Sequence, residues 1–293
     1  MRYFVQFSYL GTNYHGSQTQ PNGITVQDTM EKAFSTIVRE PIALTFAGRT
    51  DAGVHARKMV AHFDYPSALN SKLPPQAQLS TTLNSKLSAL NSLLPDDIAV
   101  ERIWQVNEDL HARFSAKSRT YEYHITTAKD PFLTGRAARV APELDFEAMN
   151  KAAQYLLGTH DFASFCKVHT DVKTTICTVT QAQWTATLQD RCTEGPLSLQ
   201  DRPYGTEGHP TPLSLSAFPP LSPSDSSAVF TITADRFLRN MVRAVVGTLF
   251  DIGRGKRKPE DMLDILEQKN RCSAGQSAPA EGLYLVDITY PEI

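Results

Sequence analysis

The sequence has few cysteines, no long apolar run and almost no net charge. Its 293 residues include four cysteines with no C-x-x-C pair, which argues against both a disulfide framework and a cysteine-rich zinc site. The eight histidines are scattered, so we expect no metal. No apolar stretch reaches the roughly 18 residues of a membrane span, and the N-terminus lacks a signal-peptide pattern. We therefore expect a cytoplasmic protein.

The net charge of −2 excludes a strongly basic protein, so any site for a polyanion must be a local patch. Residues 188–227 differ from the rest of the chain. They hold seven of the 18 prolines, seven serines, and five acidic residues against two basic ones. This composition predicts a long, disordered-like insertion between two strands. Residues 67–82 also look like an extended connection.

The hydrophobic pattern alternates between strand and helix periods. Helical spacing predicts helices over 25–38, 146–158 and 236–255, with Thr25 as the N-cap of the first and a short helix within 66–97. Alternation predicts strands over 2–11, 42–48, 58–65, 98–106, 119–127, 179–188, 228–235 and 282–290. Each half of the chain offers strands with one main helix, which is typical of the α+β class. We place the halves at 1–107 and 108–293.

The loop "AGRTDAGVHA", residues 47–56, concentrates charge and glycine between two strands. Gly48 and Gly53 permit turns that carry backbone close to a ligand. The pattern is neither a P-loop nor a dinucleotide-binding fingerprint. An aspartate flanked by glycine is most often a turn residue, so Asp51 alone predicts no chemistry. Arg49 and His55, however, place charged partners in a loop set on strands, where catalytic residues concentrate.

The helix expected over 236–255 carries two stripes. Leu238, Met241, Val242, Val245 and Leu249 form an apolar stripe that must pack on a sheet, and Arg236, Asn240, Arg243 and Gly247 form a polar stripe. A charged stripe is most often solvated. Arginines beside a small residue can also fit closely against a buried carboxylate.

Four segments in order carry a resemblance to a known family: "AGRTDAGVHA", "ARFSAKSRTYEY", "FLRNMVRAVVGTL" and "AEGLYLVDITYP". Over most of 1–187 and 228–293 the chain resembles the tRNA pseudouridine synthase A family. The resemblance implies an α+β fold of two α/β-sandwich halves with a joined, mostly antiparallel sheet and a central active-site cleft. It also implies a homodimer that needs no cofactor and isomerises uridine to pseudouridine at positions 38–40 of the tRNA anticodon stem-loop.

The same resemblance assigns roles to individual residues. Asp51 matches the catalytic nucleophile, Arg243 the arginine that pairs with it, and Tyr121 the tyrosine that stacks on the target uracil. Arg49 matches a residue implicated in base flipping, and Leu285 an apolar wall of the pocket. The expected tRNA contacts are Leu110, His111, Ala112, Arg113 and Phe114, and also His169, Thr170, Asp171, Val172 and Lys173.

Taken singly, these side chains fit ordinary structural roles. Tyr121 fits a core aromatic, Arg243 a solvated helix charge and Leu285 plain core packing, whereas the motifs together favour function for Asp51, Tyr121 and Arg243. The insertion at 188–227 departs from the family pattern, as does Cys177, which stands where members often have arginine and bears on the nearby tRNA contacts.

Several mechanisms and functions stay open at this point. A carboxylate can attack the sugar, add to the base, or abstract a sugar proton to give a glycal. A synthase acting on other RNA sites and a non-catalytic RNA-binding protein are alternatives. A hydrolase is disfavoured, because the second carboxylate, metal ligands or histidine–nucleophile spacing of such enzymes is missing.

Overall fold

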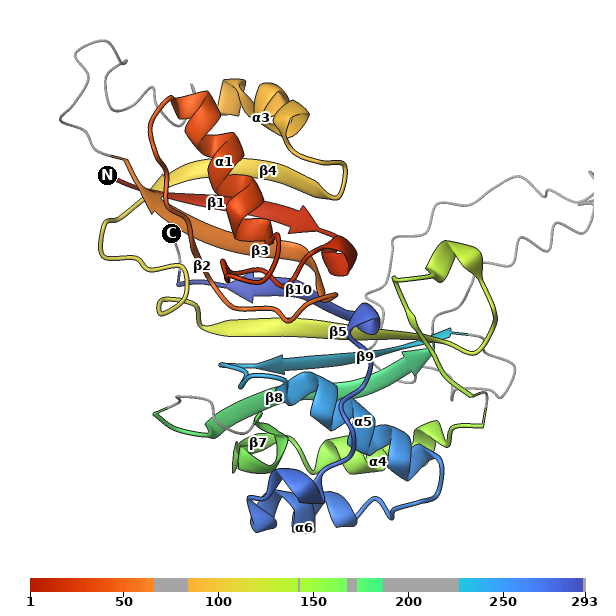
Figure 1. The fold of residues 1–293 in the computed structure, drawn as a ribbon. Coiled ribbons are helices and arrows are strands. Elements are labelled where there is room, and N and C mark those ends of the chain that lie inside the picture. Colours follow the sequence, from red (N-terminus) through yellow and green to blue (C-terminus); the bar gives the residue numbers. More distant parts are fainter. Residues whose placement is uncertain (66–83, 142, 168–172, 187–226, 292–293) are drawn as a thin grey trace, which may run out of the picture.

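The computed structural model describes residues 1–65, 84–141, 143–167, 173–186 and 227–291. These residues form one ten-stranded sheet in the order β4-β1-β3-β10-β5-β9-β8-β7, with β2 paired to β3 and β6 to β5 (Figure 1). The strands are β1 (Arg2–Tyr9), β2 (Thr45–Phe46), β3 (His55–Asp64), β4 (Ile98–Val106), β5 (Ser118–Thr126), β6 (Ala138–Arg139), β7 (Gly158–Asp161), β8 (Ile176–Ala186), β9 (Ser227–Ala234) and β10 (Leu283–Thr289).

Helices accompany both halves of this sheet. In Figure 1 one group of helices lies beside the N-terminal strands and another group beside the strands β7 to β9. They are α1 (Val26–Val38), α3 (Leu87–Leu93), α4 (Phe146–Gln154), α5 (Met241–Gly253) and α6 (Asp261–Gln268). None of the helices in the described residues is long and apolar enough to span a membrane.

The alternation in β1 shows how sequence positions the N-terminal core. Tyr3, Val5 and Phe7 are fully buried, and they belong to the same cluster as Met30 and Phe34 of α1. Thr25 caps α1 as expected, because its side chain accepts a hydrogen bond from the Asp28 amide at 3.2 Å. The C-terminal half has its own cluster, in which α4 packs on β8 and on α5, and Phe250 of α5 lies beside Trp184 of β8.

Strand β10 joins the two halves of the sheet. It pairs in parallel with β3, with Leu285 opposite Ala56, and antiparallel with β5, with Leu285 opposite Tyr121. Apart from this β3 pairing and that of β6 with β5, the strand pairs are antiparallel. The expected α+β class and the joined, mostly antiparallel sheet are therefore confirmed.

Some element boundaries differ from the expectation. The helix expected over 236–255 begins at Met241, so the prediction of its first turn is wrong. Asn240 has a left-handed φ of 66°, which interrupts a helix. The strand expected over 42–48 is reduced to Thr45–Phe46, and α6 was not predicted. Nearly all of the insertion at 188–227 and all of 67–82 lie outside the described residues, and the division after residue 107 stays a prediction.

Candidate active site

The loop that carries Asp51 joins β2 to β3 and is held at both ends. The Ala47 amide donates to the Val60 carbonyl at 2.8 Å, and the Val54 amide donates to the Asp51 carbonyl at 3.2 Å. Gly53 has a φ of 79°, where a side chain is strained, whereas a Cβ on Gly48 would meet nothing within 4 Å. The turn thus requires glycine at 53 for its backbone.

Thr50 fixes the backbone immediately before Asp51. Its amide donates to the Ser17 hydroxyl at 2.9 Å, and its carbonyl accepts from the Ser17 amide at 3.2 Å. The Thr50 hydroxyl lies 2.8 Å from that of Tyr9 at the end of β1. A Cβ on Gly16 would come within 2.9 Å of the Thr50 carbonyl oxygen. All of these groups are buried, so the segment 16–17 and β1 position the loop rigidly.

His55 ties the other side of the loop to two distant segments. Its Nδ1 accepts a hydrogen bond from the Gly11 amide at 2.9 Å, and its Nε2 lies 3.1 Å from the Glu281 carbonyl oxygen. A ring that accepts at one nitrogen and donates at the other is neutral. Burial lowers the pKa of His55 in agreement with this arrangement. His55 therefore has the structural role that its motif position left open.

Asp51 faces two guanidinium groups. Its Oδ2 lies 3.4 Å from an Nη of Arg243, and its Oδ1 lies 4.0 Å from Nε of Arg239. The Asp51 side chain is 26% exposed, so it is reachable from outside yet sheltered. Arg243 is itself clamped, because its Nε donates to the Ala278 carbonyl at 2.7 Å while the Ala278 amide donates to the Arg243 carbonyl at 2.9 Å. The clamp aims Arg243 at the carboxylate.

Tyr121 approaches the same place from β5. Its ring is half-buried and meets Phe237 edge to face, with ring centroids 5.0 Å apart. Burial raises the pKa of Tyr121 to about 12, with the Arg119 charge opposing this shift and the Asp51 charge adding to it. The hydroxyl is therefore protonated at neutral pH. The ring offers a flat face beside the carboxylate.

Arg49 and Leu285 are the remaining two residues expected at the site. Arg49 is exposed, and its guanidinium reaches Gln20 Oε1 at 3.5 Å. Leu285 is 1% exposed and belongs to the N-terminal core cluster beside Tyr121. The structure thus brings Asp51, Arg243 and Tyr121 together. Arg49 lies on the surface of the same loop, and the buried Leu285 lies opposite Tyr121 in the β10–β5 pairing.

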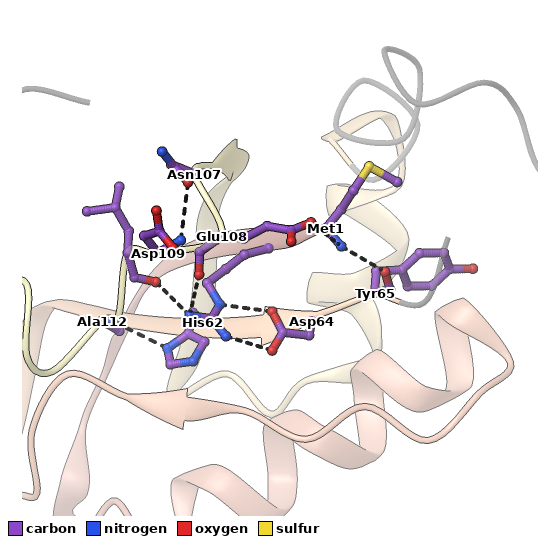
Figure 2. A network of polar contacts seen from close by, with 10 residues as sticks. Met1, His62, Asp64, Tyr65, Asn107, Glu108, Asp109 and Ala112 are labelled. Atoms are coloured by element: carbon purple, nitrogen blue, oxygen red, sulfur yellow. Dashed lines mark hydrogen bonds and ion pairs between the residues drawn. The ribbon is translucent and has the colours of Figure 1, made fainter. Parts of the chain in front are cut away.

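The loop 110–114 has a fixed backbone and two exposed side chains. The Ala112 amide donates to Nδ1 of His62 at 3.2 Å (Figure 2). Arg2 donates to the carbonyls of Glu108 and Leu110. Arg2 also forms a two-bonded ion pair with Asp64, both bonds at 2.8 Å.

Side chains also hold the backbone at the tip of this loop by hydrogen bonds. His111 accepts at Nδ1 from the Arg113 amide at 3.1 Å, and Arg119 donates to the Arg113 carbonyl at 2.5 Å. Arg113 and Phe114 are exposed, the latter by 76%, whereas Leu110 and His111 are half-buried and Ala112 is fully buried. Of the five expected contacts, Arg113 and Phe114 present their side chains most openly to a partner.

The second expected RNA-contact stretch is mostly beyond what the structure describes. His169, Thr170, Asp171 and Val172 lie outside the described residues, and Lys173 is exposed. Within the described ranges no three His, Cys, Asp or Glu side chains gather as a metal site. An open depression of about 650 Å³ lies between α4, β8 and Pro259, but none of its lining residues belongs to the Asp51 cluster.

Sequence reasoning missed Arg239 and Phe237, which complete the site. A continuous helix over 236–255 places Arg236 and Asn240 on the stripe of Arg243, and this stripe is wrong because the helix starts only after Asn240. Gly247 also serves another purpose, since a Cβ there would overlap the Gln276 backbone. Asn in a turn before a helix is a signal for a left-handed residue, but it is a weak one.

Comparison with known proteins agrees with this geometry. A profile of the family described as tRNA pseudouridine synthase matches residues 152–291. A Bacteroides thetaiotaomicron protein named tRNA pseudouridine synthase A is 47% identical over 99% of this chain and 91% of its own length. Proteins of the same name from Porphyromonas gingivalis and Bacillus licheniformis are 46% and 38% identical, each over 99% of this chain and over 97% and 99% of their own lengths.

Proposed function

Because this chain belongs to the tRNA pseudouridine synthase A family, we propose that it is an isomerase that converts uridine to pseudouridine in tRNA, with Asp51 as its nucleophile. We propose further that it acts at positions 38–40 of the anticodon stem-loop. The observation that carries this proposal is the Asp51 carboxylate, held between Arg243 and Arg239 beside the ring of Tyr121.

The chemistry asks for an ionised carboxylate in a sheltered place. Conversion breaks the bond from C1′ of ribose to N1 of uracil, turns the base, and forms a bond from C1′ to C5. The hydrogen on C5 then leaves as a proton, and N1 gains a proton. Burial disfavours a charged carboxylate, and a guanidinium offsets that cost. Arg243 supplies this compensation at 3.4 Å from Oδ2. Attack on the sugar, addition to the base and the glycal route all use the carboxylate in this state.

The target base must leave its stack to reach Asp51. Unstacking costs a few kcal/mol, and stacking on an aromatic ring returns about 1–3 kcal/mol per base. Tyr121 provides such a face, braced by Phe237 at 5.0 Å. Arg49 is exposed on the loop of the nucleophile, where it can fill the space that the base vacates.

The loop 110–114 and the stretch 169–173 are the surfaces proposed to bind tRNA. Arg113 and Phe114, presented on a fixed loop, combine a charge for phosphate with an aromatic face for a base. Lys173 is an exposed charge of the second contact stretch, in which His169 to Val172 belong to the same proposal. A homodimer in the cytoplasm that requires no cofactor completes the proposal.

Two alternatives differ in what they predict for RNA. A synthase for other RNA sites uses the same carboxylate but a different uridine, and a non-catalytic RNA-binding protein releases no proton from C5. The Asp51–Arg243 pair favours catalysis, because a binding surface gains nothing from a carboxylate among phosphates.

Tritium release from tRNA labelled at C5 of uridine separates these functions. Native protein is expected to release tritium from a tRNA with uridine at positions 38–40, and to release none when those uridines are replaced by cytidine. Release that persists after replacement would move the function to another site. No release from any cellular RNA would leave the binding protein as the better account.

A further inference from the structure

The turn 235–240, between β9 and α5, is fixed by bonds from three neighbouring segments. Arg119 donates to the Asp235 carbonyl at 2.8 Å, and the Thr178 amide donates to Oδ1 of Asp235 at 2.8 Å. The Lys167 amide donates to the Arg239 carbonyl at 3.0 Å. The backbone of Arg239 is therefore held by Lys167, and the start of its turn at Asp235 is held by strands β5 and β8.

Asn240 fixes the other side of Arg239. It adopts a φ of 66°, and its side-chain amide donates to the Ser277 hydroxyl at 2.7 Å. A left-handed non-glycine residue costs roughly 1–2 kcal/mol, and asparagine tolerates it better than most. Such strain is found where the backbone must aim a side chain. Here the strained residue directly follows Arg239.

The two arginines at Asp51 differ in how their side chains are held. Arg243 is bonded at Nε to Ala278 and is 21% exposed. Arg239 is 37% exposed, and its Nε lies 4.0 Å from Oδ1, which is beyond hydrogen-bond distance. Within the described part of the chain the Arg239 guanidinium makes no hydrogen bond. A fixed backbone thus presents a guanidinium whose donors are available to another anion.

A nucleotide that enters this site brings such an anion with it. Each uridine is flanked by phosphates, and a phosphate drawn toward Asp51 is repelled by the carboxylate unless a cation lies between them. We propose that Arg239 binds a backbone phosphate of the target nucleotide, exchanging its loose contact with Asp51 for that phosphate as the nucleotide enters. This inference rests on the proposed function, because it requires an RNA nucleotide beside Asp51.

The same turn also supports the base-stacking ring. Phe237, two residues before Arg239, packs edge to face on Tyr121. One rigid turn therefore braces the ring offered to the base and presents a guanidinium to the backbone of the same nucleotide. Arg243 remains bonded to Ala278 and can stay with the carboxylate throughout.

The test combines Arg239→Gln with neutral phosphates. Full-length tRNA is assembled with a methylphosphonate on the 5′ or the 3′ side of the reacting uridine. Single-turnover tritium release against enzyme concentration then gives the half-saturating concentration. One of the two methylphosphonates should raise this value about ten-fold or more for native protein. With unmodified tRNA, Arg239→Gln should already have a similarly raised half-saturating concentration. That methylphosphonate should change the value by less than about two-fold, because the guanidinium that binds the phosphate is absent from the variant.

Two variants control for charge and fold. Arg254→Gln removes the same charge from the exposed far end of α5, and it should keep the native sensitivity to both methylphosphonates. Arg239→Lys keeps a cation and should retain part of the sensitivity. Arg239→Gln should also lower the slope of log affinity against log salt concentration by about 0.7–0.9.

Contrary outcomes are distinguishable. Full sensitivity of Arg239→Gln to both methylphosphonates, or a lower maximal rate with unchanged half-saturation, would overturn the phosphate contact while leaving the proposed function in place. Absence of tritium release by native protein would remove the proposed function and this inference with it.

Discussion

Asp51 illustrates how one side chain is prepared by residues far away in sequence. Thr50, bonded to Ser17 and Tyr9, fixes the backbone, and Arg243 faces one carboxylate oxygen. At about 4 Å and an effective dielectric constant near 20, such a charge pair interacts by roughly 4 kcal/mol before desolvation is counted. This gross attraction offsets the cost of sheltering the carboxylate, so the site retains a charged group where a reaction needs one.

Substitution of Tyr121 tests whether its ring holds the target base. Its ring is proposed to stack on the target uracil. Phe has a ring that can stack in the same way, whereas Leu has none. Tyr121→Leu should lower kcat/KM about 5- to 150-fold, equivalent to roughly 1–3 kcal/mol, and Tyr121→Phe should lose clearly less. Single-turnover tritium release measures both variants. Equal activity of the Leu and Phe variants would contradict a stacking role.

The residues of the site were predictable to different degrees. Asp51, Tyr121 and Arg243 lie in motifs whose family resemblance names them, and the structure brings the three together. Arg239 lies in one of those motifs too, yet its contact with Asp51 depends on the left-handed Asn240. A helical wheel cannot represent that change of direction, so the periodic pattern favoured Arg236 instead.

At the scale of elements, α5 and the segment 275–279 are packed backbone to backbone. The Gly275 amide donates to the Thr248 hydroxyl at 2.8 Å, and a Cβ on Gly247 would overlap the Gln276 carbonyl. This close crossing brings Ala278 to Arg243, and the Ala278 carbonyl accepts a hydrogen bond from Arg243 Nε at 2.7 Å. Gly247 therefore allows the close contact that positions Arg243, one helical turn earlier.

Gly247→Ala tests this crossing. The added methyl group meets backbone that cannot move without displacing Ala278, so we expect a loss of about 3 kcal/mol in the free energy of unfolding and a loss of activity. Gly253→Ala is the matched control, because the atoms it approaches belong to the Met149 and Leu144 side chains. Calorimetry should show a clearly larger fall in Tm for Gly247→Ala; equal falls would contradict the role of the crossing.

Element boundaries followed the sequence pattern wherever local forces decide them. The strand of residues 2–9 alternates in burial from Val5 onward, and the strand 98–106 alternates over its first four residues. Thr25 with Asp28 supplies a cap that needs no tertiary partner. The strand expected over 42–48 shrank because pairing with β3, a tertiary property, extends over only Thr45 and Phe46. The start of α5 likewise depends on Ser277, a residue distant in sequence.

At the scale of the whole molecule, the site exists because both halves contribute to it. Asp51 belongs to the N-terminal half, whereas Tyr121, Arg239 and Arg243 come from the C-terminal half. Strand β10 joins the two, and His55 ties Gly11 to Glu281 across the join. The C-terminal strand is thus a structural part of the centre of the sheet, and its position follows from pairing and not from sequence order.

Acid should lower the stability of the fold by protonating the buried His62. Burial lowers the pKa of His62 from its ordinary 6.5 to about 4, with Arg2 and His111 lowering it further and Asp64 opposing them. The folded state therefore favours neutral His62, which accepts from the Ala112 amide. Its stabilising contribution is complete above pH 6.5 and is lost as the pH falls from 6.5 toward 4.

Comparison with His62→Asn isolates this contribution. Asparagine keeps an acceptor for the Ala112 amide but does not titrate. The variant should lose less Tm than native protein between pH 6.5 and pH 4, whereas both should behave alike above pH 7. Parallel curves throughout the acid range would show that another group carries the acid sensitivity.

The most direct test of Asp51 as the nucleophile is tritium release from C5-labelled tRNA by native protein and by Asp51→Asn. We expect release by the native protein alone, with tRNA affinity of the variant nearly unchanged, because the substitution removes the reacting carboxylate and keeps the phosphate contacts. Tritium release by Asp51→Asn at a rate near that of the native protein would contradict the central claim that Asp51 carries the chemistry.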